Sequence, residues 1–268
     1  MGVTLLDGAT GTRLWELAEA AGYARTPTWR YNLEHPELVT RVTEEYIAAG
    51  SQLVCANTFA VNGVELARHG PAPSVAEVTA AGVCLAKQAA AGTGVRVALD
   101  IGQLPTMQEP CGPLTAAQAR DYYAEVLAGG LPEGPDVVFF ETFTDLRQLQ
   151  AAVEAAAGCA VPVLCSLTFD RGGNTMMGDS PAAIVAALEP MGVAALGLNC
   201  SFGPALAVPV IRDLAVHTKL PLILKPNADC GPADFAETLR EALPLVRYIG
   251  ACCGSNPDYI RALKKLVE

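Results

Sequence analysis

Eight short apolar runs recur along the chain, and each leads through Gly, Asn, Asp or Pro into a segment with helical spacing. The runs cover residues 3–8, 52–59, 96–102, 136–143, 162–169, 194–200, 221–227 and 247–254. Their hydrophobicity is continuous rather than alternating, which is typical of strands covered on both faces in a parallel sheet. The pattern therefore predicts eight buried parallel strands.

The segments between these runs carry helix signals. In residues 35–50, apolar side chains recur on one stripe, and the segment stops at Gly50, a residue type that often ends helices. Three further helices are predicted to begin at residues that commonly cap a helix N-terminus, namely Thr115, Ser180 and Asn256. Strands and helices thus alternate along the chain.

Eight strand–helix units without a linker or a change in composition predict a single (β/α)₈ barrel domain over residues 1–268. The structural alternative is a doubly wound open sheet. Such a sheet usually has fewer strands, and the first strand here lacks the G-x-G-x-x-G turn of a dinucleotide-binding fold. The barrel is therefore the favoured architecture.

Composition and charge exclude several classes of function. The chain has 268 residues, is 51% hydrophobic, and carries a net charge of −10. An acidic protein of this kind is not expected to bind nucleic acid, because phosphate recognition needs a basic surface. The apolar runs are too short to cross a bilayer, so no membrane association is expected. Nine cysteines without a secretory signal favour a reducing, cytoplasmic location over a disulfide framework.

Polar residues gather at the ends of the predicted strands, where a (β/α)₈ barrel builds its active site. We expect side chains from these positions to converge at one end of the barrel. They are Asp7, Gly8, Asn57, Thr58, Asp100, Glu141, Thr142, Thr168, Asn199, Cys200, Asn227, Cys252 and Cys253.

Three cysteines among them, Cys200, Cys252 and Cys253, suit a catalytic zinc site. Three thiolates can hold zinc and leave its fourth tetrahedral position open for a substrate. Adjacent residues of a regular strand point to opposite faces, so both Cys252 and Cys253 can bind one ion only if the strand breaks near Gly254. The alternatives are buried core cysteines, a vicinal disulfide or chance.

Two carboxylates, Asp7 and Glu141, end apolar strands, where a charge is costly unless it meets a cation or a ligand. They could receive the ammonium group of a substrate. They could equally form a salt bridge or cap a helix within the barrel.

Several motifs resemble the homocysteine S-methyltransferase family. They are DGATGT at 7–12, ANTF at 56–59, DIG at 100–102, FETFTD at 140–145, TFD at 168–170, GLNCSFGP at 197–204, KPNA at 225–228 and GACCGSNP at 250–257. The likeness runs through nearly the whole chain in the correct order. It is greatest to the homocysteine-binding module of cobalamin-dependent methionine synthase.

The resemblance implies a site for zinc and homocysteine. If the matching positions have the same roles as in the family, Cys200, Cys252 and Cys253 bind zinc, and Asn227 is the fourth ligand while substrate is absent. Asp7 and Glu141 would hold the homocysteine amino group, and backbone amides around Gly8 and Ala9 its carboxylate. Asn57, Asp100 and Asn199 are expected to complete the substrate pocket. No other catalytic side chain is expected, because zinc itself keeps the substrate sulfur a thiolate that attacks the methyl group.

The methyl donor is left open. The favoured reading is a methylcorrinoid, such as methylcobalamin, held by a separate protein, since the chain has no D-x-H-x-x-G run for binding one. Short segments after ANTF and between KPNA and GACCG, and the sequence DIGQLPT, depart from the family pattern where the donor would meet the barrel. A small donor, namely S-methylmethionine, betaine or dimethylsulfide, is the alternative. A non-catalytic zinc- or thiol-binding subunit of a methyltransferase complex is the alternative of another class.

Overall fold

Each predicted apolar run contains a β-strand in the computed structural model, which describes residues 2–70 and 73–268. The strands are β1 (Thr4–Leu5), β2 (Leu53–Cys55), β3 (Arg96–Gly102), β4 (Val137–Phe143), β5 (Val163–Leu167), β6 (Ala195–Cys200), β7 (Leu222–Pro226) and β8 (Tyr248–Ile249). Neighbouring strands pair in parallel in the order β1-β8-β7-β6-β5-β4-β3-β2.

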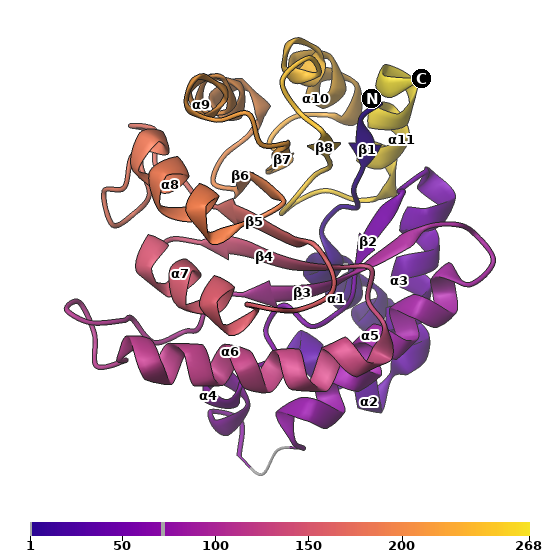
Figure 1. Ribbon diagram of the computed structural model, residues 1–268. Helices are drawn as coiled ribbons and strands as arrows, with labels where there is room; N and C mark the ends of the chain where they lie inside the picture. The colour runs from indigo at the N-terminus through magenta and orange to yellow at the C-terminus, as the bar shows by residue number, and fades with distance from the viewer. Residues whose placement is uncertain (1, 71–72) are drawn as a thin grey trace.

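The sheet curves into a nearly closed (β/α)₈ barrel, as the sequence predicts (Figure 1). At the seam between β1 and β2, the amide of Gln52 donates a hydrogen bond to the carbonyl of Leu5 at 2.7 Å, and the Gln52 side chain accepts one from the Leu5 amide at 2.9 Å. These two contacts bring the first and second strands together. All eight strand ends consequently face one rim.

Helices surround the barrel and alternate with its strands (Figure 1). Their bounds are α1 (Thr10–Ala20), α2 (Tyr31–Glu34), α3 (Pro36–Ala49), α4 (Gly63–Ala67), α5 (Val75–Ala90), α6 (Ala116–Gly130), α7 (Leu146–Ala155), α8 (Pro181–Leu188), α9 (Pro204–His217), α10 (Pro232–Leu239) and α11 (Pro257–Val267).

The predicted helix signals are confirmed. The side chains of Thr115, Ser180 and Asn256 accept hydrogen bonds from backbone amides in the first turns of α6, α8 and α11. Such bonds satisfy amides that have no partner inside the helix. Gly50 ends α3 with φ of 115°, a left-handed conformation that glycine adopts at low cost.

The first and last strands are shorter than the predicted runs 3–8 and 247–254. The chain beyond them nevertheless stays bonded to its neighbours. The amide of Ala251 donates to the carbonyl of Asp7 at 3.1 Å, and that of Cys252 to the carbonyl of Pro226 at 2.8 Å. Regular pairing stops here because the chain turns at Gly254, which has φ of 81°.

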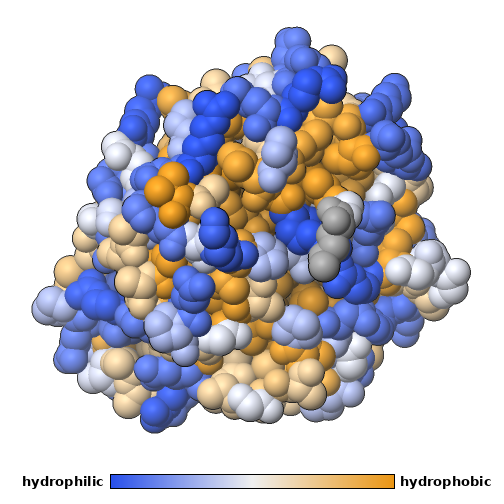
Figure 2. Space-filling model, turned by 45° about the horizontal axis from the view of Figure 1, so that its top comes forward, coloured by the Kyte–Doolittle hydropathy of each residue, from blue (hydrophilic) through white to orange (hydrophobic). Residues whose placement is uncertain are grey.

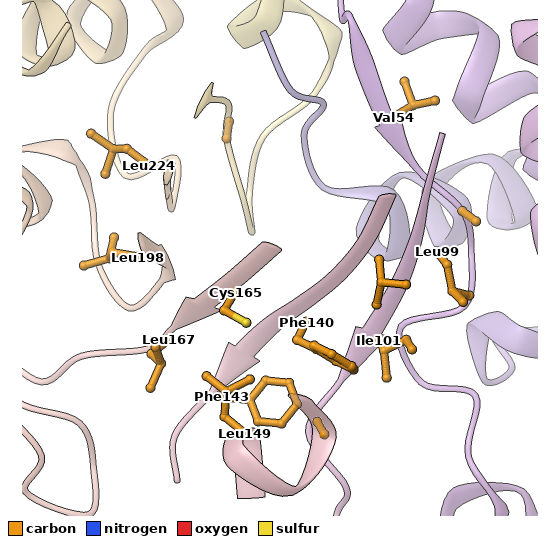
Figure 3. Packing of buried hydrophobic residues seen from close by; sticks show 14 of the residues in the cluster. Val54, Leu99, Ile101, Phe140, Phe143, Leu149, Cys165, Leu167, Leu198 and Leu224 are labelled. Carbon is orange, nitrogen blue, oxygen red and sulfur yellow. The ribbon is translucent and has the colours of Figure 1, made fainter. Parts of the chain in front are cut away.

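Two apolar layers hold the barrel together. Outward-facing strand residues pack against the helices, as Figure 3 shows for Phe140, Phe143 and Leu149, where α7 covers β4. Inside the barrel lies a smaller cluster, called the inner core below. Its members are Leu6, Leu53, Cys55, Ala98, Val137, Phe139, Leu164, Ala195 and Ile223.

Hydrophilic residues are interspersed with hydrophobic ones on the face of the molecule shown in Figure 2. Within residues 2–70 and 73–268, no helix combines the length and the apolar character needed to traverse a bilayer.

Candidate active site

The three predicted zinc ligands meet at the rim of the barrel. The sulfurs of Cys200, Cys252 and Cys253 all lie within 4.8 Å of one another, and those of Cys200 and Cys253 are 3.6 Å apart. Sulfurs bound at about 2.3 Å to a tetrahedral zinc stand about 3.8 Å from each other. The three thiols are free. Their spacing therefore fits one zinc ion.

Local backbone turns explain how cysteines from two strands converge. Cys200, the last residue of β6, has φ of 58°, and the chain after Cys253 turns at Gly254. The carbonyl of Cys253 accepts a hydrogen bond from the amide of Ala228 at 2.9 Å, which ties this turn to the segment after β7. The expected break in the strand is confirmed. It allows neighbouring cysteines to face the same point.

Protons are shared unequally among these sulfurs. Hydrogen bonds from Cys200 and Cys252 lower the pKa of Cys253 to about 3. Hydrogen bonds between Cys200 and the other two cysteines, Cys252 and Cys253, raise the pKa of Cys200. The cluster thus favours a thiolate at neutral pH, the form that binds metals.

Asn227 lies just after β7, where its backbone amide donates to the carbonyl of Phe202 at 3.0 Å. Its side-chain Oδ1 is buried and has no hydrogen-bond partner among the described residues. A buried acceptor without a partner is costly. An oxygen left in this state is compatible with the predicted role of Asn227 as a fourth zinc ligand.

Four charged side chains occupy the barrel interior at the same end, and we call them the charged layer. They are Asp7, Asp100 in β3, Glu141 in β4 and Lys225 in β7, each at most 8% exposed. The Lys225 Nζ is 3.2 Å from Asp7 Oδ1 and 3.0 Å from Glu141 Oε2. The two predicted carboxylates are therefore brought together, with a lysine between them.

Lys225 was not among the predicted site residues. Its sequence signal was a single lysine within the apolar run PLILKPN, because a charge in a buried strand requires partners. Ser255 was also missed. Its hydroxyl accepts a hydrogen bond from the amide of Ala9 at 3.0 Å, and its sequence signal was its place in the motif GACCGSNP.

Burial and charge shape the protonation of this layer. Burial raises the pKa of Glu141 to about 7, although the Lys225 ammonium acts in the opposite direction. Burial, together with the Glu141 charge, raises the pKa of Asp100 well above its usual value. Burial disfavours the charge of Lys225, but its anionic surroundings, including Glu141 and Asp7, outweigh this and raise its pKa. The layer thus carries more carboxyl groups than its single ammonium can pair.

The carboxylate of Asp100 differs from those of Asp7 and Glu141 in its hydrogen bonding. Its Oδ1 is buried without a partner in the described part of the chain. A carboxylate oxygen of Asp100, one of Glu141 and the sulfur of Cys55 lie within 4.8 Å of one another. A second metal ion is disfavoured there, because the Lys225 ammonium lies 3.0 Å from Glu141 and 3.8 Å from Cys55. The negative charge of Asp100 and Glu141 suits a cationic group better.

Asn199 bridges the charged layer and the cysteines. Its Oδ1 accepts hydrogen bonds from the amide of Thr142 at 2.8 Å and the hydroxyl of Ser166 at 2.7 Å. Its Nδ2 donates to Thr142 Oγ1 at 2.6 Å and lies 3.8 Å from Cys252 Sγ. Thr142 is held with φ of 64°, next to Glu141. The side-chain amide of Asn199 thus serves to position its neighbours.

Asn57 is placed differently from the other predicted residues. Its side-chain nitrogen donates to the carbonyl of Thr28 at 2.8 Å and to Asn32 Oδ1 at 2.7 Å. These bonds hold Thr28 and the helix α2 against the end of β2. The side-chain nitrogen of Asn57 therefore stabilises the fold. A contact with substrate would have to involve its side-chain oxygen.

The turn at Gly8 and Ala9 lies under the N-terminus of α1. A Cβ on Gly8 would be 2.6 Å from Ser255 Oγ and 2.9 Å from the ring of Tyr46, so only glycine fits there. The carbonyl of Ala9 accepts a hydrogen bond from the hydroxyl of Tyr46 at 3.0 Å. These contacts fix the turn beside Asp7, where backbone amides of α1 begin.

Comparison with known proteins places this geometry in context. The family model described as homocysteine S-methyltransferase matches residues 4–267. The methionine synthase of Mycobacterium leprae (strain TN) is 31% identical over 271 residues, covering 88% of this chain and 22% of the relative. That of Mycobacterium tuberculosis (strain ATCC 25618 / H37Rv) is 30% identical over 264 residues, with the same coverage. The chain spans about a fifth of the length of these curated relatives.

Solved structures agree with the fold. The oxidized form of the homocysteine methyltransferase MmuM from Escherichia coli has a TM-score of 0.84 and 25% identity, covering 98% of this chain and 95% of that chain. Its apo form has a TM-score of 0.77 and 25% identity, covering 99% and 96%. The carboxyl transferase domain of Rhizobium etli pyruvate carboxylase, at 13% identity, TM-score 0.55 and coverage of 99% and 47%, shares the barrel fold alone.

Proposed function

This chain belongs to the homocysteine S-methyltransferase family, and from that premise we propose that it transfers a methyl group to the thiol of homocysteine, giving methionine. The observation that carries the proposal is the position of three converging cysteines beside a buried carboxylate layer. The cysteines suit a metal that binds a thiol, and the carboxylates suit the ammonium of an amino acid.

Cys200, Cys252 and Cys253 would hold a zinc ion, with Asn227 at the fourth position until substrate arrives. When bound, zinc lowers the pKa of a thiol at that fourth position, so that the sulfur is a thiolate at neutral pH. The acceptor sulfur then forms its bond to the methyl carbon while the bond between that carbon and the donor breaks.

The amino acid part of homocysteine would be held next to the metal. Glu141 would offer a carboxylate to the ammonium, and amides around Gly8 and Ala9, at the start of α1, would meet the carboxylate of the substrate. Asn199 keeps Thr142, the neighbour of Glu141, in place. Holding the amino acid in this way positions its sulfur for a single line of attack.

We further propose a methylcorrinoid on a separate protein as the donor. The similarity to two mycobacterial methionine synthases supports this choice. A small donor is the second candidate, because the segments that would meet the donor depart from the family pattern. S-Methylmethionine, betaine and dimethylsulfide are the compounds to examine.

A donor assay tests the proposal. Zinc-loaded protein is incubated with homocysteine and, in separate reactions, methylcobalamin, S-methylmethionine, betaine or dimethylsulfide, and methionine is measured. We expect methionine from methylcobalamin and none without the protein. Activity with a small donor alone would overturn the corrinoid proposal, and no methionine from any donor would count against methyl transfer.

X-ray absorption at the zinc edge separates an enzyme from a non-catalytic zinc-binding subunit. Adding homocysteine should replace one nitrogen or oxygen neighbour of zinc by sulfur. The Cys165→Ala variant serves as the control, because it removes a buried cysteine outside the proposed ligand set and should show the same change as the wild type. An unchanged zinc shell in the wild type would favour the non-catalytic subunit.

A further inference from the structure

A hollow of about 550 Å³ lies at the end of the barrel where the strands begin, opposite the cysteines, and we call it the lower hollow. The lining residues that matter for its chemistry are Thr4, Gln52, Gly94, Arg96 and Arg247. No aspartate or glutamate lines it within residues 2–70 and 73–268. Its volume is in the range of small-molecule binding sites. The lower hollow therefore combines space with positive charge.

The lower hollow lies beneath the seam between β1 and β2, the two ends of the strand order. Arg96 begins β3 two positions before Ala98 of the inner core, so the two side chains face the same, interior side. Thr4 lies two positions before Leu6, which belongs to the same core. The hollow is thus the lower mouth of the barrel, below the inner core.

Arg247 reaches the same mouth from the start of β8. Its guanidinium carbon is 5.8 Å from the ring centre of Tyr248, and that ring packs against the inner core. Arg96 and Arg247 are both half-buried. A guanidinium is always charged, because its pKa is far above neutrality. Two permanent positive charges therefore line one hollow.

These two arginines differ from most others in the chain. Within the described residues, neither forms an ion pair with a carboxylate, although the chain has 28 acidic residues against 18 basic ones. The arginines that do form such pairs are Arg13, Arg30, Arg41, Arg68, Arg147, Arg212, Arg240 and Arg261. In an acidic protein, two unpaired cations at one hollow favour an anion from outside the chain.

Other groups at the lower hollow suit an anion as well. The Oε1 of Gln52 accepts the Leu5 amide at 2.9 Å, so the Nε2 of that side chain is the group that can donate to a ligand. Gly94 has φ of 78°, and a Cβ there would meet nothing within 4 Å. A ligand can therefore approach the backbone at Gly94 closely.

We propose that the lower hollow binds a small molecule through a dianionic phosphate group, with Arg96 and Arg247 as its charged ligands. The planar fork of arginine matches phosphate oxygens in pairs. Phosphate also concentrates about two negative charges in one group, which balances the two guanidinium charges. The rest of the hollow has room for the body of the molecule. This site lies at the opposite end of the barrel from the proposed methyl transfer and does not depend on it.

Calorimetry of the 268-residue protein with inorganic phosphate tests the assignment. The buffer is poor in chloride, because salt screens exposed charges, and its pH is about 8, where phosphate is mostly a dianion. We expect one phosphate per chain, with a dissociation constant of about 1 mM or lower. Succinate, a dianion whose charges lie on two separate carboxylates, should bind more weakly.

Arg96→Gln and Arg247→Gln should each weaken phosphate binding at least tenfold. Arg96→Lys keeps the charge and the aliphatic stem but lacks the fork, so its loss should be smaller than that of Arg96→Gln. Thermal unfolding of each variant without phosphate shows whether it is folded. Should Arg96→Gln fail to fold, the comparison of Arg96→Lys and Arg247→Gln with the wild type remains.

Arg25→Gln is a matched control. The Arg25 guanidinium also lies over an aromatic ring, 3.8 Å from the centre of Trp15, and it has no ion pair among the described residues. The substitution removes the same charge outside the lower hollow, so phosphate affinity should stay within about twofold of the wild type.

Three results would overturn the proposal. The first is the absence of saturable phosphate binding by the wild type. The second is a loss in Arg25→Gln as large as in the Arg96 and Arg247 variants, or no loss in either of the latter, since phosphate would then be bound elsewhere or by net charge alone. The third is tighter binding of succinate than of phosphate, which would make the ligand a dicarboxylate.

Discussion

The inner core and the charged layer occupy the same barrel and in part the same strands, yet they differ in every chemical respect. On β3, β4 and β7, the apolar residues Ala98, Phe139 and Ile223 are followed two positions later by Asp100, Glu141 and Lys225. Residues two apart on a strand face the same side. The interior therefore changes from apolar to charged within one pleat.

The difference shows how a barrel divides its interior between stability and function. The inner core is filled by side chains that need no hydrogen bonds. Their burial therefore costs little free energy, and they can pack densely. Among the described residues, the charged layer includes a buried oxygen without a partner at Asp100, and the rim another at Asn227. Buried polar groups in that state lower stability. At these two positions, a bound ligand could supply the missing partner.

The largest effect is expected at the rim. Cys200→Ala, Cys252→Ala and Cys253→Ala should each abolish stoichiometric zinc and methyl transfer while the barrel stays folded, because the inner core is untouched. Zinc analysis and circular dichroism check this. Cys165→Ala on β5 is the control, because Cys165 is buried away from the other sulfurs and its loss should leave zinc bound. Full zinc in any of the three variants would remove that residue from the ligand set.

In the inner core, Leu164→Ala should have the converse effect. Removing a fully buried leucine costs about 2–5 kcal/mol in the free energy of unfolding. Denaturant unfolding measures the loss. The folded fraction should still bind zinc and homocysteine as the wild type does. A large loss of homocysteine affinity would mean that the two layers are not separable.

Within the charged layer, Glu141→Gln should weaken homocysteine binding, while the Lys225 ammonium keeps Asp7 as its charged partner. Replacing a charge-assisted hydrogen bond by a neutral one costs about 2 kcal/mol, or about 30-fold in the dissociation constant. Calorimetry provides the value. Glu133→Gln is a control for removing a negative charge elsewhere, since Glu133 lies outside the layer, bonded to Cys84. An unchanged affinity in Glu141→Gln would exclude Glu141 as an ammonium ligand.

The smallest effect is expected where the two layers meet on β5. Ser166 follows Leu164 on the same face and donates one hydrogen bond to Asn199. Ser166→Ala should cost about 1 kcal/mol, because Asn199 Oδ1 keeps the amide of Thr142 as a donor. Thermal unfolding and homocysteine affinity should both change little. A loss as large as that of Glu141→Gln would give Ser166 a direct part in binding.

The architecture could be predicted because it depends on local pattern. Continuous apolar runs separated by helix signals indicated the strands, and the structure confirms the barrel. The convergence of Cys200, Cys252 and Cys253 was predicted for the same reason, since strand ends of a barrel meet at one rim. Strand lengths at both ends of the chain were overestimated, because the sequence could not reveal where regular pairing gives way to turns.

Contacts across the barrel could not be predicted in this way. Lys225 meets Asp7 across 218 positions of sequence, and that contact depends on strand order, register and the space beside Gly250. The side-chain nitrogen of Asn57 donates to Thr28 and Asn32, two partners that its position at a strand end did not indicate. Residue type and position at a strand end do not specify where an amide finds its partners.

The sequence by itself determined the barrel, the family and the convergence of three cysteines at one rim, because each follows from short motifs and from hydrophobic periodicity. Only the tertiary structure decided how the buried charges are paired. Three carboxyl groups and one lysine can be matched in several ways. The choice among them is made by distances of a few ångströms between strands that the chain brings together only on folding.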